Sequence, residues 1–263
     1  MKKALRPLFD VACYIIVFLV VQTLCILLLK VILRRQDIDA DTMIWGSVAS
    51  SAITAILFVV FKWARLSANY LRTRPWTVLF WVTTLTLGTI LPSEWLLEQL
   101  NFEMPEEYEI IFTQIISKPY GYLAIGLLVP LAEEIVFRGA ILRVLLEWMG
   151  DRMHWVAIVV SALLFGVMHG NLPQFTHGFL LGLLLGWMYY RTRSIIPGLA
   201  LHWVNNTVAY VCSNLMPGFT DNNLLELCGD DQRKVAMYLL FSLCMFLPSL
   251  FQLAKRMKQA NNE

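Results

Sequence analysis

Four long runs without a charged residue constrain this chain more than any other feature. They cover residues 11–29, 42–61, 75–93 and 235–254. A helix needs roughly 20 mainly apolar residues to cross the hydrocarbon core of a bilayer, and each run has about that length. The runs are continuous, whereas the strands of a membrane β-barrel alternate between apolar and polar residues. The sequence therefore predicts an integral-membrane protein built from helices.

The composition excludes several other classes. Hydrophobic residues make up 58% of the 263 residues and charged residues only 15%, whereas about a quarter of the residues are charged in soluble domains. A net charge of +2 is too small to imply nucleic acid as a partner. The cysteines form no close pair in the sequence, so we interpret them as small apolar residues rather than disulfides or metal ligands.

A denser block, residues 119–214, contains further apolar segments separated by short turns. We divide it into 119–147, 155–170, 175–190 and 195–213, because turn-forming residues separate these segments. The expected fold is an all-α, polytopic transmembrane helical bundle of about eight spans. Most Lys and Arg residues fall on the inner side if the N-terminus is cytoplasmic, so the positive-inside rule places both termini in the cytoplasm.

This division predicts three regions. Residues 1–118 form an N-terminal membrane region with three spans and an acidic exterior loop at 94–109, which includes an interfacial helix. Residues 119–214 form a four-span core. Residues 215–263 contain an exterior loop, the last span and a basic cytoplasmic tail.

The core block carries ionisable residues inside apolar segments, where charges are costly and by default mark function. Fourteen uncharged residues precede Glu133 and Glu134. Glu134 and Arg138 are four residues apart, so they share a helix face and can form an ion pair. Glu133 is rotated by about 100° and is free to face another helix. We therefore interpret the pair as structural support and Glu133 as a chemical group.

Two further motifs supply polar groups to the same block. In a hairpin that turns at 149–151, His169 reaches a depth similar to that of Glu133, because the two lie at similar distances from the turn. His202 and Asn206 share one helix face, which suits an oxyanion cradle or a metal ligand with its supporting partner. Hydrogen bonding between helices is the alternative for these two.

Other polar or small residues of the block receive structural roles. Asn205 faces away from His202 and is expected to pack, and His177 is expected to be interfacial. Glycines at 178, 182 and 186 form a ridge that lets another helix approach closely.

We expect Glu133, His169, His202 and Asn206 to converge on one water-accessible cavity. Counting residues complicates this expectation, because His202 lies only about 12 Å along its helix from the 191–194 turn. That places His202 nearer the cytoplasmic face than His169. Tilted helices, or an interfacial stretch near 143–148, must then close the gap.

The motifs Glu-Glu-x-x-x-Arg (133–138), Phe-x-x-x-His (165–169) and His-x-x-x-Asn (202–206) lie in separate apolar segments. Together they resemble the CPBP group of intramembrane proteases, which includes type II CAAX prenyl endopeptidases and Abi-like bacteriocin-processing or immunity proteins. The resemblance covers about residues 119–214. It implies an endopeptidase that hydrolyses a peptide bond of a membrane-associated protein or peptide.

The resemblance also implies a role for each motif residue. Glu133 and His169 would activate the attacking water, and His202 and Asn206 would stabilise the oxyanion. Glu134 and Arg138 would hold the site together. Members are often described as metalloproteases, and Glu133, His169 and His202 could form a zinc shell with an open position for water. No His-Glu-x-x-His helix is present, so a divalent metal such as zinc stays an open alternative.

Two other functions and two locations also stay open. The chain could be a non-catalytic membrane scaffold or bacteriocin-immunity protein that retains the polar core, or a small transporter that uses the Glu/His cluster as a proton relay. We expect the bacterial cytoplasmic membrane, because the chain is short and lacks long loops. The endoplasmic-reticulum membrane is the alternative.

The topology can be tested with reporter fusions at each terminus. With eight spans, both reporters should give the cytoplasmic signal, because an even number of crossings returns the chain to its starting side. Signals from opposite sides would contradict the count of eight.

Overall fold

The computed structural model describes residues 2–66, 69–216 and 223–258. Every regular element in these ranges is a helix, which confirms the predicted all-α class. In chain order the elements are α1 (Lys2–Ile32), α2 (Ala40–Val60), α3 (Asn69–Arg72), α4 (Trp76–Leu100), α5 (Glu106–Ile116), η1 (Leu123–Leu128), α6 (Val129–Glu133), η2 (Glu134–Leu142), α7 (Arg143–Met149), η3 (Asp151–Met153), α8 (His154–Val167), α9 (Leu172–Thr192), α10 (Ile196–Leu215), α11 (Leu224–Leu227) and α12 (Gln232–Arg256). Asp221 of the expected exterior loop and residues 259–263 of the expected basic tail lie outside the described residues.

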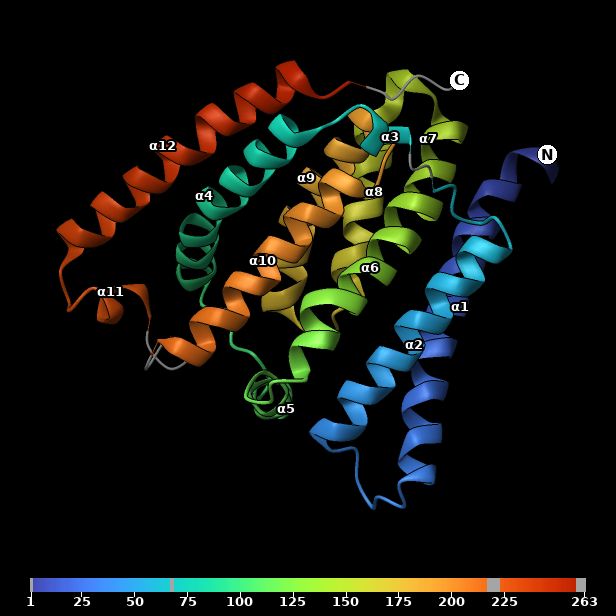
Figure 1. Cartoon of the computed structure of the whole chain (residues 1–263), viewed down its shortest axis with the longest axis horizontal. Coiled ribbons are helices and arrows are strands. Elements are labelled where there is room, and N and C mark those ends of the chain that lie inside the picture. The colour runs from blue at the N-terminus through green and yellow to red at the C-terminus, as the bar shows by residue number, and fades with distance from the viewer. Residues whose placement is uncertain (1, 67–68, 217–222, 259–263) are drawn as a thin grey trace.

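The bundle has a central group of helices between two helix pairs (Figure 1). The continuous path from η1 to α7, with α8, α9 and α10, forms the centre. The α1–α2 hairpin packs on one side of this centre through both of its helices, and the α4–α12 pair packs on the other side through α4. The start of α1 and the end of α12 lie at the same end of the bundle, while α5 and α11 lie at the opposite end.

Four helices in the described ranges are long and apolar enough to cross a membrane. They are residues Leu5–Ile32 of α1 and the whole of α2, α4 and α12, which correspond to the four charge-free runs of the sequence. Large apolar side chains on these helices face outward, among them Leu28, Ile56, Phe80 and Phe241. Exposed apolar surface of this extent marks a site of membrane or protein contact, and together with the four long apolar helices it supports an integral-membrane protein.

The core segments have the boundaries that the turn residues predicted. Gly150 and Gly170 adopt positive φ angles of 72° and 74°, and Arg193 adopts a φ of 53°. These left-handed residues stop the helical hydrogen-bond pattern between α7 and α8, α8 and α9, and α9 and α10. The Asn171 side chain then accepts from the Gln174 N–H and begins α9.

The path from η1 to α7 includes two π-helical segments, a rare conformation that occurs frequently at functional sites. At the end of η1 the Val129 N–H donates to the Ala124 carbonyl, five residues earlier. In that register the carbonyl of Ile125 would accept from residue 130. Because residue 130 is proline and has no N–H, the Ile125 carbonyl needs a partner from another helix.

Residues 94–109, the acidic stretch that was expected to form an exterior loop with an interfacial helix, begin inside helix α4. Helix α4 continues past Ser93 to Leu100 and ends only where Asn101 adopts a left-handed conformation, with φ 50°. Glu94 and Glu98 are therefore helical, and Glu98 accepts from the backbone N–H of Leu224, at 2.6 Å. The rest of the stretch contains the start of α5, whose first turn carries three glutamates.

The contact between α4 and α12 generates a prediction at Gly88. A Cβ atom there would lie 2.7 Å from the Phe246 backbone nitrogen, so Gly88→Leu should force the two helices apart. Overpacking of this kind costs about 1–3 kcal/mol, and the thermal unfolding temperature in detergent should fall. The neighbouring Leu87 is 40% exposed, so Leu87→Ala should leave that temperature nearly unchanged. Equal stability of the two variants would contradict this packing.

Candidate active site

A buried ion pair lies at the middle of the core. The Arg138 guanidinium donates to Glu134 Oε1 at 2.9 Å, and the two side chains are 1% and 0% exposed. Both residues are in η2, four positions apart, as the sequence predicted. An ion pair this deep stabilises the fold only while both partners are present, because either charge alone would be buried without compensation.

His202 of α10 contacts both adjacent glutamates. Its Nδ1 lies 3.3 Å from Glu134 Oε1, and its Nε2 lies 3.6 Å from Glu133 Oε2. Glu133 does face another helix, as expected, but Glu134 reaches the same imidazole ring from the other side. Two carboxylates and one guanidinium give the cluster a net negative charge, and the imidazole ring presents one nitrogen to each carboxylate.

Glycines of α9 and α10 make room for the cluster. A Cβ at Gly198 would lie 2.9 Å from Glu134 Oε2, and one at Gly182 would lie 3.4 Å from Arg138 Nη2. The ridge that includes Gly182 also packs closely on α8, where a Cβ at Gly186 would lie 2.9 Å from Ile158. The predicted packing role of the glycine ridge is confirmed, and the ridge also provides space for the guanidinium.

Phe165 connects the three motifs, although sequence reasoning gave it no role. The Arg138 guanidinium lies over its ring, 4.4 Å from the centroid. The His169 and His202 rings meet it edge to face, at centroid separations of 5.1 and 5.9 Å. The signal in the sequence was its place in Phe-x-x-x-His, four residues before His169. Its contacts show a packing reason for that position.

His169 lies beside the cluster through Phe165. Its Nδ1 is 3.0 Å from the Phe165 carbonyl oxygen, which leaves Nε2 free for another partner. Within the described part of the chain no ion pair or hydrogen bond joins His169 to Glu133. The direct contact of Glu133 is with His202, another of the residues expected to converge with it.

Asn206 binds the carbonyl that Pro130 leaves without a backbone donor. Its Nδ2 donates to the Ile125 oxygen at 3.0 Å. Asn205 was expected to pack, and its contacts in the structure are polar: its Nδ2 contacts His177 Nε2 at 3.3 Å and donates to Asn206 Oδ1 at 3.1 Å. His177, which was expected to be interfacial, is half-buried and contacts this polar group from α9.

Two structural features bear on the depth of His202, which residue counting placed nearer the cytoplasmic face than His169. The segment between Glu134 and the Gly150 turn includes the nine residues of η2, and π turns contain more residues than α turns, so it advances less per residue. The segment then continues into α7, where Arg143 pairs with the half-exposed Glu147. Residues 150–153 at the turn are exposed.

The described side chains do not form the zinc shell considered from the sequence. Among the described residues no group of three or more His, Cys, Asp or Glu side chains is arranged to hold a metal ion. Glu133 and His202 are neighbours, and the contact of His169 Nδ1 with the Phe165 carbonyl leaves its Nε2 available as a ligand.

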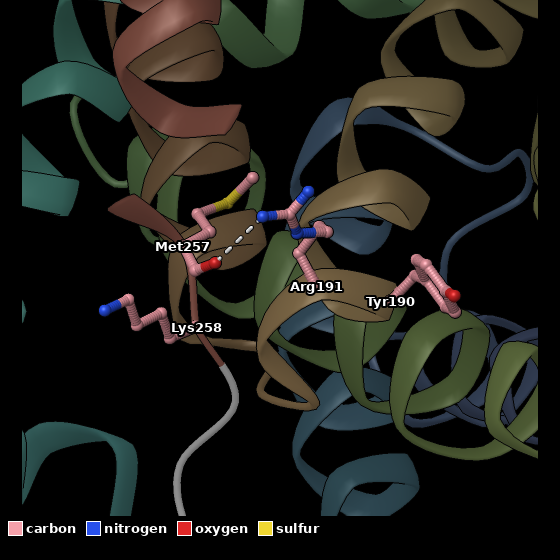
Figure 2. A pocket seen from close by; sticks show the side chains of 4 residues that line it. All are labelled: Tyr190, Arg191, Met257 and Lys258. Atoms are coloured by element: carbon pink, nitrogen blue, oxygen red, sulfur yellow. Dashed lines mark hydrogen bonds between the residues drawn. The ribbon is translucent and has the colours of Figure 1, made fainter. Parts of the chain in front are cut away.

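A separate pocket lies at the end of the bundle where α9 and α12 finish (Figure 2). Tyr190, Arg191, Met257 and Lys258 line it, and none of the predicted site residues does. The Arg191 guanidinium donates to the carbonyls of Ala254 and Met257, at 2.8 and 3.2 Å. These bonds satisfy carbonyls at the C-terminal end of α12, so the arginine has a structural role there.

Comparison with protein families gives one match. Residues 116–208 match the family described as Rce1-like, type II CAAX prenyl endopeptidase Rce1-like. All three motifs lie within the match, and the predicted family resemblance is confirmed for this part of the chain. Comparison with curated proteins found no match, and comparison with solved structures found none either.

The buried pair predicts a difference between the two glutamates in protein stability. Glu134→Gln and Arg138→Ala each leave a buried charge unpaired, so each should lower stability by about 3–5 kcal/mol. Glu133 is 15% exposed, and Glu133→Gln should unfold near the temperature of the unchanged protein. Thermal unfolding in detergent measures all three, and a Glu133→Gln variant less stable than Glu134→Gln would reverse the roles.

Proposed function

We propose that this chain is an intramembrane endopeptidase that hydrolyses a peptide bond of a membrane-associated protein or peptide. The observation that carries the proposal is the contact between Glu133 and His202, within the segment that matches the type II CAAX prenyl endopeptidase family. A carboxylate beside an imidazole is an arrangement that general acid–base catalysis uses. Here it lies next to a buried ion pair that fixes both side chains.

Glu133 is proposed as the general base. Its carboxylate is the more exposed of the two glutamates, at 15% against 0%, so it can meet water that Glu134 cannot reach. In the reaction a water oxygen attacks the peptide carbonyl carbon while Glu133 takes the water proton. The carbon–nitrogen bond then breaks, and the same proton goes to the leaving amine. The free Nε2 of His169 provides a second contact for the water.

His202 and Asn206 are proposed as the donors to the oxyanion. The 3.6 Å between His202 Nε2 and Glu133 Oε2 exceeds an ordinary hydrogen bond, so an N–H at Nε2 is not held by Glu133 and can donate to the oxyanion. Asn206 uses one amide hydrogen on Ile125 and keeps the second for the substrate. Donors that are fixed before the reaction stabilise the transition state at little reorganisation cost.

The full topology is part of the proposal. We propose eight spans with both termini cytoplasmic, in which the four core segments cross the membrane together with α1, α2, α4 and α12. The start of α1 and the end of α12 lie at one end of the bundle (Figure 1), which supports an even number of crossings. Residues 119–214 would be the catalytic core, in a bacterial cytoplasmic membrane or, alternatively, that of the endoplasmic reticulum.

One observation favours a second function. Glu134, Arg138 and Phe165 are almost completely buried, so much of the polar core is inaccessible to a substrate. A scaffold or immunity protein would need this buried network for packing and would not need an accessible Glu133. A measurement of peptide cleavage separates the two functions. An endopeptidase loses cleavage when Glu133 is changed, even if the protein stays equally stable, whereas a scaffold has no cleavage to lose.

The proposed activity can be tested with purified protein in detergent or liposomes and a panel of membrane-associated peptides, with and without a C-terminal prenyl group. Glu133→Gln should lower the cleavage rate by about 10²–10⁴-fold, the usual contribution of a positioned acid or base. The matched control is Glu107→Gln, which removes an exposed carboxylate of α5 and should cleave normally. Equal cleavage by Glu133→Gln and the unchanged protein would contradict the role of Glu133, and a panel left uncut would favour the scaffold.

A further inference from the structure

We infer that His177 and Asn205 are positioning residues that set the orientation of the Asn206 amide. Neither residue belongs to the three motifs. The inference rests on the proposed function, in which the Asn206 amide donates to the oxyanion, and it concerns how that donor is aimed. Its basis is a series of side-chain contacts that runs from α9 through α10 to η1.

The contacts form an ordered series. His177 of α9 approaches Asn205 of α10, with its Nε2 3.3 Å from Asn205 Nδ2. The same Asn205 Nδ2 donates to Asn206 Oδ1 at 3.1 Å. Asn206 Nδ2 in turn donates to the Ile125 carbonyl at 3.0 Å. Each amide nitrogen has two hydrogens, so Asn205 uses both and Asn206 retains one.

The orientation of an asparagine amide depends on its partners, because a rotation of 180° exchanges the oxygen and the nitrogen. Rotation of Asn206 would place its NH₂ against the NH₂ of Asn205 and its oxygen against the Ile125 carbonyl oxygen. Both new contacts would be repulsive. The two fixed partners therefore hold Asn206 with its nitrogen towards η1, which is the orientation that leaves a hydrogen for the oxyanion.

Asn205 needs a fixed partner of its own, and His177 provides it. An Asn205 amide without that partner could rotate and present its oxygen to Asn206 Oδ1, which would favour rotation of Asn206 as well. Neutral His177 with its proton on Nδ1 accepts at Nε2 and so requires the Asn205 nitrogen on that side. The orientation is thus transmitted from α9 to the donor without any contact between His177 and Glu133.

The chain of contacts predicts specific effects of substitution. His177→Phe keeps an aromatic ring but removes the acceptor, whereas His177→Gln restores an acceptor through its amide oxygen. His177→Phe and Asn205→Leu should each lower kcat by about tenfold, the effect of one misdirected hydrogen bond, with KM unchanged. The His177→Phe/Asn205→Leu double variant should be no slower than Asn205→Leu, because both changes interrupt one chain.

A second measurement does not depend on catalysis. In protein labelled with ¹⁵N-asparagine, the side-chain amide of Asn206 is assigned by its loss in Asn206→Ala, and its hydrogen exchange is followed by NMR in detergent. We expect exchange at Asn206 to become about tenfold faster in His177→Phe and to return to normal in His177→Gln. Thermal unfolding of each variant is recorded in the same detergent.

The outcomes separate this inference from the proposed function. Unchanged exchange at Asn206 in His177→Phe would overturn the inference whatever the activity, as would a His177→Gln variant that behaves like His177→Phe. Faster exchange in a protein that cleaves no peptide would support the positioning role and contradict the endopeptidase. A rate loss that only follows a fall in unfolding temperature would also overturn the inference, because it would show a structural role alone.

Discussion

The ion pair between Glu134 and Arg138 is the interaction on which the rest of the core depends. Its side chains are 0% and 1% exposed, so neither charge can be satisfied by solvent, and each neighbour is arranged around the pair. His202 approaches the carboxylate, Phe165 lies under the guanidinium, and glycines of α9 and α10 leave the necessary volume. Because a buried charge without compensation costs several kcal/mol, the helices that supply these neighbours are held in one arrangement. The more exposed Glu133 takes its position from the same arrangement.

The π-helical path from η1 to η2 connects this core to the proposed chemistry. Wide turns shorten the segment per residue, so Glu133 and Glu134 come level with His202 although a count along an ideal helix separates them. The same geometry, with Pro130, leaves the Ile125 carbonyl without a backbone donor, and Asn206 supplies one. The proline interrupts the hydrogen bonds of the helix and so leaves a carbonyl that a side chain of α10 can bind. The backbone irregularity and the polar cluster support each other, which is common where helices carry functional groups.

Much of the fold could be predicted from the sequence because its signals are local. The apolar runs predicted α1, α2, α4 and α12, and Gly150, Gly170 and Arg193 marked the ends of core helices. The spacing of Glu134 and Arg138 predicted their ion pair. One expectation was wrong, namely the loop at Glu94, because helix α4 continues to Leu100. Where that helix ends depends on what its residues meet in space, and neither hydropathy nor spacing carries that information.

The sequence by itself determined that the chain is helical and membrane-embedded, and that its polar residues gather in three motifs of one block. These properties follow from burial of apolar surface in lipid and from helical periodicity, which act over neighbouring residues. Only the tertiary structure decided that His202 contacts both glutamates, that Phe165 lies under Arg138, and that His177 and Asn205 continue to Asn206. The physical reason is that these contacts join different helices, so they depend on helix rotation and depth. Helix rotation and depth depend in turn on how closely the helices approach one another at glycines and on the length of a π-helical segment.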